Sequence, residues 1–236
     1  MPESSRTVVV AGGTGALGGS VARAFLASGA NVVVTSQRQA EIDELAASAG
    51  KNSKLSGVVL DVTDEAAARK FIADIESKYG SVDALVITVG GYAGGKNVWE
   101  ADSAIYELML KLNLRAALVM ARAVLPGMVK RNRGTIVNIA SRAAYGHSAG
   151  AALYSASKAA VLALFDSLAE EVKSYNVNVN SIVPSIMDTP ANRRAMPKAD
   201  FSLWPKTDDI AKVIVFLCSE DARVIHGAAV PVYGRT

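Results

Sequence analysis

Three polar side chains in the stretch SRAAYGHSAGAALYSASKAAV, residues 141–161, are spaced so that they could act on one substrate. Tyr154 and Lys158 stand four residues apart in a helical pattern, which places them on one helix face. An ammonium beside a phenol favours the phenolate and lowers the pKa of the tyrosine toward the range of a general acid or base. We therefore expect Tyr154 to give a proton to a substrate oxygen. The alternative is a tyrosine ring that only packs over a lysine stem.

Ser141 follows the apolar run GTIVNIA at 134–140, which predicts a buried strand of a parallel sheet. Ligands of open α/β sheets bind at the carboxyl ends of the strands, so the Ser141 hydroxyl is expected to hold the oxygen that Tyr154 protonates. Hydride transfer to carbon with proton transfer to oxygen is carbonyl reduction. His147 is an alternative base, but we expect it to line the pocket or to bond within its own loop.

Short β-branched runs alternate with amphipathic helical segments along the chain. This alternation predicts a single α/β domain over residues 1–236, a Rossmann-type doubly wound parallel sheet of about seven strands with helices on both faces. The stretch 185–207 has no strand pattern, and we expect it to be a substrate lid. Strands are expected at 7–11, 31–35, 57–61, 84–88, 134–140, 177–183 and 228–233, and the later helices at 64–80, 103–130, 152–175 and 208–219.

The composition favours one large, well-buried α/β domain, since half of the 236 residues are hydrophobic and one fifth are charged, with a net charge of only +3. The basic run at 130–133 closes a helical pattern and does not indicate nucleic-acid binding. The single Cys218 excludes an intrachain disulfide, and with two histidines no metal site is expected. No signal or membrane segment is apparent, so we expect a cytoplasmic protein without a membrane partner.

A glycine-rich turn, AGGTGALGG at 11–19, joins the first expected strand to a helix. Glycines let the backbone approach a pyrophosphate, and the N–H groups of the helix N-terminus stabilise its charge. In this position the turn predicts a dinucleotide site. Contacts are expected from Gly12, Thr14, Gly15, Ala16, Leu17 and Gly18.

The adenosine ribose is expected just after the second strand, at Ser36, Gln37 and Arg38. An acid there would accept the 2′-hydroxyl, and none is present. A 2′-phosphate would be tolerated and Arg38 could pair with it, so we expect NADP(H) to be preferred and NAD(H) to be possible. The alternative is that Arg38 is an ordinary solvated charge.

These features together resemble the short-chain dehydrogenase/reductase family over nearly the whole chain. The family's loose glycine pattern maps onto Gly12, Ala16 and Gly18, and its catalytic Ser, Tyr and Lys map onto Ser141, Tyr154 and Lys158. The resemblance implies that Asn113, in KLNLRAAL, is the fourth catalytic residue and anchors a water that links Lys158 to solvent. An exposed polar residue within a helix is the alternative for Asn113.

The same resemblance implies further cofactor contacts, with the adenine amine at Asp61 and with the nicotinamide end at Ile186 and Thr189. A charge at a helix N-terminus is the alternative for Asp61. The family's N-N-A-G and Pro-Gly are replaced here by Ile87-Thr88-Val89-Gly90 and Pro184-Ser185. Contacts through the backbone are therefore expected there, and the implied cofactor residues also include Val62, Val89, Gly90, Tyr154, Lys158 and Pro184.

Two loops, VGGYAGG at 89–95 and MDTPANRRAMPKADFSLW at 187–204, are similar to those of quinonoid dihydropteridine reductase. They imply a flat substrate surface made by Tyr92, Met187, Phe201 and Trp204, with ordinary lid packing as the alternative. Reductases of that kind lack the catalytic serine and carry an acid for NADH after the second strand, whereas this chain has Ser141 and Ser36.

Reduction of a ketone, aldehyde or 3-oxoacyl-type carbonyl is thus the first hypothesis, and reduction of a dihydropterin with NADH is the second. A non-catalytic dinucleotide-binding redox sensor is the alternative of another class. The complete set of Asn113, Ser141, Tyr154 and Lys158 disfavours it, because a sensor does not need a proton donor and relay.

The helices expected at 103–130 and 152–175 carry small and apolar residues beyond one stripe, which predicts that two of their faces are covered. The family resemblance implies that such helices pair across a two-fold axis, so a homodimer or homotetramer is expected. The residues concerned are Ala116, Ala117, Ala121, Ala156, Ala159, Ala160, Ala163 and Phe165.

Overall fold

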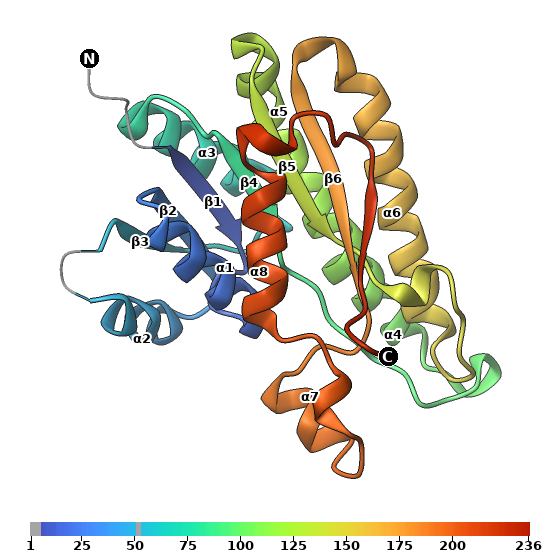
Figure 1. Ribbon diagram of the computed structural model, residues 1–236. Helices are drawn as coiled ribbons and strands as arrows, with labels where there is room; N and C mark the ends of the chain where they lie inside the picture. Colours follow the sequence, from blue (N-terminus) through green and yellow to red (C-terminus); the bar gives the residue numbers. More distant parts are fainter. Residues whose placement is uncertain (1–5, 51–52) are drawn as a thin grey trace.

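A seven-stranded parallel sheet forms the centre of the computed structural model, which describes residues 6–50 and 53–236 (Figure 1). All neighbouring strands are parallel, with registers such as Val9 opposite both Val33 and Leu85. The predicted fold class is thereby confirmed. In order across the sheet the strands are β3 (Leu55–Val59), β2 (Asn31–Ser36), β1 (Thr7–Ala11), β4 (Ala84–Ile87), β5 (Gly134–Ile139), β6 (Val177–Pro184) and β7 (Ala229–Val232).

Helices cover both faces of the sheet because successive strand residues point to opposite sides. In β1, Val8 and Val10 belong to one buried cluster and Val9 and Ala11 to the other. The first cluster is covered by α1 (Ala16–Ala27), α2 (Gln39–Ala49) and α8 (Thr207–Leu217), and the second by α3 (Glu65–Tyr79), α5 (Ala116–Arg131) and α6 (Ala152–Val172).

One long helical segment contains a wide turn that the sequence pattern does not predict. The helix α4 (Ser103–Met109) passes into a π-helical stretch, Leu110–Arg115, and continues as α5. The predicted helix at 103–130 is therefore continuous but has a π-helical turn around Asn113. Such π turns are frequent at functional sites.

Helix α6 and its short 3₁₀ continuation, Ala152–Tyr175, form the one stretch among the described helices that is long and apolar enough to cross a membrane. In this fold its inner face lies on the sheet, where Val161, Phe165 and Ala169 are buried. Burial in the core therefore explains the apolar residues on that face of α6.

Half of the eight residues expected at an oligomer interface lie in the protomer core, so the prediction is wrong for those four. Ala116, Ala117, Ala121 and Phe165 are at most 2% exposed, because they pack under α3 and against the sheet. Ala159 and Ala160 are half-buried. Ala156 and Ala163, which belong to the predicted set, are exposed on α6, and Tyr106 and Leu108 are exposed on α4.

The sheet changes direction between β1 and β4, where the chain proceeds toward β2 on one side and toward β5 on the other. Ligands of open α/β sheets bind at such a switch point, outside the carboxyl ends of the strands. Residues Ala11, Ser36, Ile87, Ile139 and Pro184 end their strands at this edge. The predicted active-site residues therefore have to converge here.

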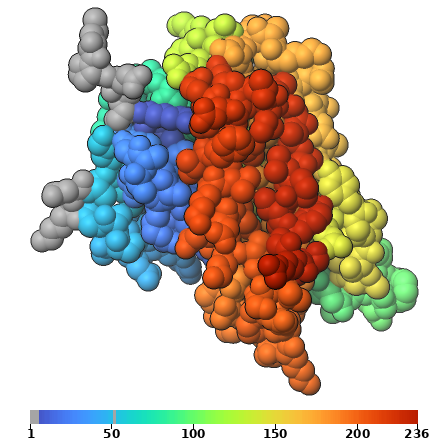
Figure 2. Space-filling model, in the orientation of Figure 1, coloured from blue at the N-terminus to red at the C-terminus, as the bar shows by residue number. Residues whose placement is uncertain are grey.

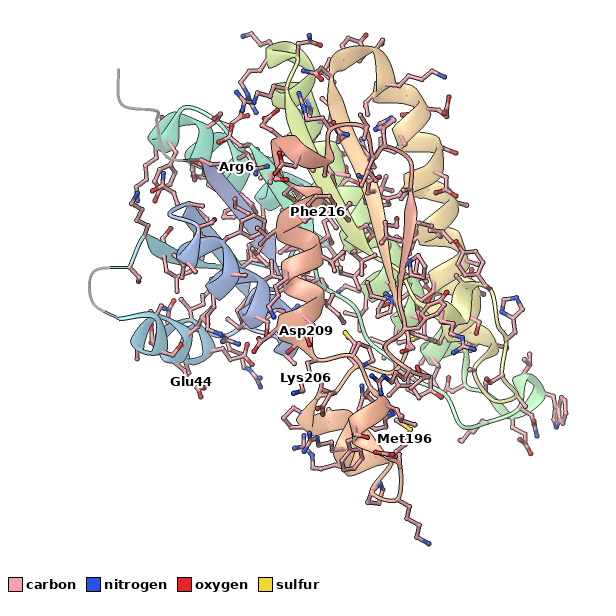
Figure 3. The ribbon with its side chains drawn as sticks, viewed as in Figure 1. Arg6, Glu44, Met196, Lys206, Asp209 and Phe216 are labelled. Carbon is pink, nitrogen blue, oxygen red and sulfur yellow. The ribbon has the colours of Figure 1, made fainter. Side chains whose placement is uncertain are left out.

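The segment from Ser185 to Lys206, which we call the lid, projects beyond this edge (Figures 1 and 2). It contains α7 (Pro190–Ala195) and a 3₁₀ turn, Phe201–Leu203. Its two ends are joined, because Asp188 pairs with Lys206 in an isolated parallel bridge and the Asp188 N–H donates to Pro205 O at 2.9 Å. Figure 3 labels Met196 within the lid and Lys206 where it meets α8.

The glycine-rich turn tolerates no side chain where helix α1 passes closest to it. A Cβ added at Gly18 would lie 2.2 Å from the carbonyl oxygen of Gly12, which itself has φ +79°. Both positions therefore require glycine, for close approach and for backbone conformation respectively.

We predict that Gly18→Ala lowers the free energy of unfolding by about 1–3 kcal/mol, because the added methyl overlaps a backbone oxygen that cannot move freely. Gly15→Ala is the matched control, since its Cβ would lie 3.4 Å from the nearest atom. It should change stability by no more than about 0.5 kcal/mol. Urea unfolding of both variants is the measurement, and equal stabilities would contradict the close contact.

Candidate active site

The N-terminus of α1 offers free backbone N–H groups next to the glycine-rich turn. Gly15 is the N-cap residue, and no side chain within the described part of the chain caps this end. Gly15 and Ala16 are exposed, whereas Leu17 and Gly18 are buried. A diphosphate fits this cradle, since a helix N-terminus with exposed N–H groups stabilises an anion.

Thr88 holds the turn in place, which the sequence analysis did not foresee. Its hydroxyl oxygen lies 2.8 Å from the Ala11 carbonyl and 3.0 Å from the Gly12 carbonyl, and it donates to this pair. The residue stands where the related family has an asparagine, and it links the end of β4 to the end of β1. Val89, the next residue, packs over Gly12, so this strand end does contribute to the cofactor cradle.

The expected ribose end is occupied by a small polar cluster around a carboxylate. Ser36 is buried at the end of β2, while Gln37 and Arg38 are exposed. Arg38 forms an ion pair with Glu41 of α2, which also accepts hydrogen bonds from Ser36 at 2.5 Å and from Thr14 at 2.9 Å. The prediction placed a free Arg38 here, and the structure adds an acid beside it.

Asp61 lies two residues beyond β3 and has one oxygen committed locally. Its Oδ1 accepts from the Thr63 N–H at 2.9 Å and the Thr63 hydroxyl at 2.7 Å, and these bonds lower the pKa of the carboxyl. The alternative of a helix N-terminal charge is wrong, because Asp64 caps α3. The adenine contact of Asp61 and the buried Val62 stays a prediction, and Oδ2 of Asp61 lies 3.7 Å from Lys111.

The proposed proton donor and its partners converge at the end of β5. Ser141 follows that strand, and its hydroxyl interacts with the phenol of Tyr154, which is largely buried on α6. Lys158, one turn further along α6, is buried and donates to the Ile139 carbonyl at 2.9 Å. The three residues therefore lie together at the carboxyl edge.

The pKa of Tyr154 does not follow the prediction. Burial raises the pKa of its phenol, and the hydrogen bond with Ser141 acts in the opposite direction without reversing the shift. Burial also lowers the pKa of Lys158 to about 8. The expected lowering of the Tyr154 pKa by Lys158 is wrong here, because desolvation of the phenol dominates and the ammonium is directed at Ile139. A protonated Tyr154 at neutral pH is the form that a proton donor requires.

Asn113 is buried in the π-helical turn, so the alternative of an exposed residue is wrong. Its side-chain amide links two segments of the chain by hydrogen bonds. Its Oδ1 accepts from the Gly91 N–H at 2.9 Å, and its Nδ2 donates to the Gly91 carbonyl at 3.0 Å and to Ser157 Oγ at 2.9 Å. Ser157 in turn donates to the Tyr154 carbonyl at 2.7 Å. The loop after β4 is thereby fixed to the helix that carries Tyr154.

Gly90 lies next to both the Asn113 side-chain amide and the Lys158 ammonium. A Cβ at this position would lie 2.9 Å from Asn113 Oδ1 and 3.3 Å from Lys158 Nζ. The amide and the ammonium therefore approach the same backbone segment. A glycine leaves this space open, and a larger residue would push the two groups apart.

The predicted substrate-pocket residues have different surroundings. Tyr92 is 64% exposed and stands edge-on to Tyr154, with ring centroids 5.0 Å apart. Trp204 is only 7% exposed, and its ring centroid lies 4.9 Å from that of Phe201. The Arg193 guanidinium lies over the Phe201 ring. The two lid aromatics thus follow the alternative of lid packing, and Trp204 is not available as a stacking surface.

Some of the remaining predicted residues end or follow β6 at the carboxyl edge of the sheet, and the others lie in loops outside it. Pro184 ends β6, Ile186 is exposed, and Met187 is half-buried. The hydroxyl of Thr189 caps α7 by accepting from the Asn192 N–H at 3.2 Å. His147 is exposed and its Nδ1 lies 3.1 Å from the Ala143 carbonyl, which is the bonding within its own loop that we expected.

Comparisons with known proteins identify the relatives of this chain. A family model described as short chain dehydrogenase matches residues 6–200. Human dehydrogenase/reductase SDR family member 4 is 30% identical over 246 residues, covering 100% of this chain and 88% of its own. Meso-2,3-butanediol dehydrogenase of Serratia marcescens is 31% identical over 238 residues, covering 98% and 94%. The structure of ElxO with NADP bound superposes with a TM-score of 0.91 at 27% identity over 98% of both chains.

The buried Lys158 gives a testable pH dependence of stability. Its pKa is about 8 in the folded chain and near the ordinary 10.5 in the unfolded chain, so between these values the unfolded chain binds more protons. Wild-type stability should therefore rise relative to Lys158→Met from pH 8 to pH 10.5, by at most about 3 kcal/mol. Below pH 8 the difference between the two proteins should be constant.

Urea unfolding at a series of pH values measures this difference. Lys173→Met, on the exposed continuation of the same helix, is the matched control. A difference between wild type and Lys158→Met that does not change with pH would show that the ammonium is not desolvated.

Proposed function

The chain belongs to the short-chain dehydrogenase/reductase family, and we propose that it reduces a ketone or aldehyde carbonyl to an alcohol. Family membership and the NADP-bound structural relative make it an oxidoreductase that uses NAD(P)(H). The observation that carries the finer proposal is the convergence of Ser141 and the protonated Tyr154 at the carboxyl edge beside Lys158.

A bound reduced nicotinamide would supply the hydride, and the residues of this chain would handle the oxygen. Ser141 holds the carbonyl oxygen by a hydrogen bond and orients it toward the phenol. Tyr154 gives its proton to this oxygen as negative charge develops there. The high pKa of Tyr154 keeps the proton in place until then.

The names of relatives support an alcohol and a ketone as the two forms of the substrate. The Serratia relative is named for meso-2,3-butanediol, which is a secondary alcohol. The exposed ring of Tyr92 beside Tyr154 suits a small or flat substrate that enters from solvent. A dihydropterin is the second substrate hypothesis, and the burial of Trp204 removes one of the four residues that supported it.

We predict that Tyr154→Phe lowers turnover by about 10²- to 10⁴-fold, the range that general acid catalysis supplies. The ring and its packing remain, so the affinity for NADH or NADPH should stay within about threefold. Tyr175→Phe, at the far end of α6, is the control and should retain wild-type activity.

The assay follows oxidation of NADPH and of NADH with ketones, diketones, β-keto esters and a quinonoid dihydropterin. Tyr154→Phe with near-wild-type carbonyl reduction would overturn the mechanism. Activity on the dihydropterin alone would replace the proposed substrate class, and cofactor binding without turnover of any of these compounds would favour the redox-sensor hypothesis.

We also propose that the protein is a homodimer or homotetramer whose interface includes the exposed faces of α4 and α6. Tyr106 and Leu108 of α4 are more than two fifths exposed in the protomer, and Ala156 and Ala163 of α6 are exposed as well. A cytoplasmic location stays a prediction.

Sedimentation equilibrium at micromolar protein should therefore give a multiple of the 24.6 kDa chain mass. Leu108→Asp should shift the mass toward the monomer, because it places a charge in the interface. Val224→Asp, at a fully exposed site, should not. A monomeric wild type would reject the assembly.

A further inference from the structure

A carboxylate that the sequence analysis did not single out, Glu41, lies at the expected ribose end of the dinucleotide site. We propose that Glu41 sets the cofactor selectivity. Its carboxylate accepts a hydrogen bond from the 2′-hydroxyl of NAD(H) and repels the 2′-phosphate of NADP(H). It also pairs with Arg38, the side chain that would otherwise bind this phosphate. The inference rests on the proposed dinucleotide site, and it names a residue outside the positions where the family resemblance implied ribose contacts.

Glu41 is held by groups from both loops that border the ribose. It stands in the first turn of α2, and one carboxylate oxygen accepts from Thr14 at 2.9 Å and from Ser36 at 2.5 Å. Thr14 belongs to the glycine-rich turn, and Ser36 ends β2. The carboxylate therefore bridges the pyrophosphate cradle and the strand end where an acid usually binds the 2′-hydroxyl.

The Ser36 hydroxyl is oriented for this contact rather than for a ligand. It accepts the Arg38 N–H at 3.2 Å and donates its own proton to Glu41. Because the donor is used, a 2′-phosphate cannot gain a hydrogen bond from Ser36 unless Glu41 moves. The side chain of Glu41 is 32% exposed, so part of the carboxylate remains open to a ribose.

The charge of Glu41 is permanent at neutral pH. Hydrogen bonds from Ser36, Arg38 and Thr14 lower its pKa to about 2. An ionised carboxylate accepts a hydroxyl proton readily and repels a phosphate dianion.

Arg38 is the side chain expected to bind a 2′-phosphate, and Glu41 holds it in an ion pair. The guanidinium is 75% exposed, so it can turn to a phosphate, but only by leaving Glu41 unpaired. The absence of an acid at Ser36, from which a preference for NADP(H) was expected, is thus offset by an acid that reaches the same place from α2.

The test is Glu41→Gln, which keeps the shape and can still accept from Thr14 and Ser36 while removing the charge. Dissociation constants of NADPH, NADH, 2′,5′-ADP and 5′-AMP are measured by calorimetry, since binding does not depend on turnover. The ratio of the NADH to the NADPH dissociation constant should rise by about tenfold or more, as expected when a charge contact of this kind is removed. Glu41→Ala should change it in the same direction.

Glu44→Gln is the matched control for overall charge. Glu44 lies on the same helix, is exposed and does not belong to the cluster of Thr14, Ser36, Arg38 and Glu41; it is labelled in Figure 3. It should alter the ratio by less than about twofold, because an exposed carboxylate that makes no contact with the ribose acts only through solvent.

A double-mutant cycle tests the competition for Arg38. Arg38→Ala should weaken NADPH and 2′,5′-ADP binding more in the Glu41→Gln background than in the wild type, because only there is the guanidinium free for the phosphate. Equal effects in both backgrounds, or an unchanged cofactor ratio in Glu41→Gln, would overturn the role of Glu41 while leaving the proposed function intact. A wild-type protein that binds neither dinucleotide would instead remove the proposed function and the inference together.

Discussion

The contact between Gly18 and the Gly12 carbonyl fixes how closely the first helix approaches the sheet, and the site is built outward from it. Thr88 binds the carbonyls of the same turn and so ties the end of β4 to the end of β1. Two residues further on, Gly90 lies against Asn113 and Lys158. A continuous series of backbone contacts thus runs from the phosphate cradle to the proton-handling residues. Distances between the two halves of the site are set by close packing of the backbone and of the side chains that contact it.

Burial has opposite effects on the two ionisable groups of the catalytic helix, and the effects complement each other. It favours the neutral phenol of Tyr154 and the neutral amine of Lys158. A donor that holds its proton firmly stands next to a lysine that releases its own more easily than a surface lysine does. The carbonyl of Ile139 and the side-chain amide of Asn113 provide the polar partners that such buried groups need.

The fold was predictable because hydrophobic periodicity is strong in this chain. Runs such as TVVVA and GTIVNI become β1 and β5 with boundaries within one or two residues. The positions of Ser141, Tyr154 and Lys158 followed from the same pattern. The π-helical turn at Asn113 did not, because the segment is helical on both sides of the turn and no local sequence pattern marks where a helix widens.

Other parts of the site depend on three-dimensional contacts that no local pattern contains. Glu41 reaches back over five residues to Ser36, and the bond to Thr14 spans 27 residues. The direction of the Tyr154 pKa shift depends on how much of the phenol is buried, which spacing alone cannot give. Ala116, Ala117 and Ala121, which were expected at an interface, are buried inside the protomer, because the sequence does not tell which apolar positions of α5 meet the sheet.

Because Asp188 and Lys206 pair with each other, the lid segment between them can be replaced as a unit. Its two ends are already neighbours, so the length and sequence between them can change at little entropic cost to the rest of the fold. Neither β6 nor α8 would have to shift when these residues are replaced. New substrates can therefore be accommodated by grafting a different segment between two fixed points, with the cofactor site and the proton donor inherited unchanged.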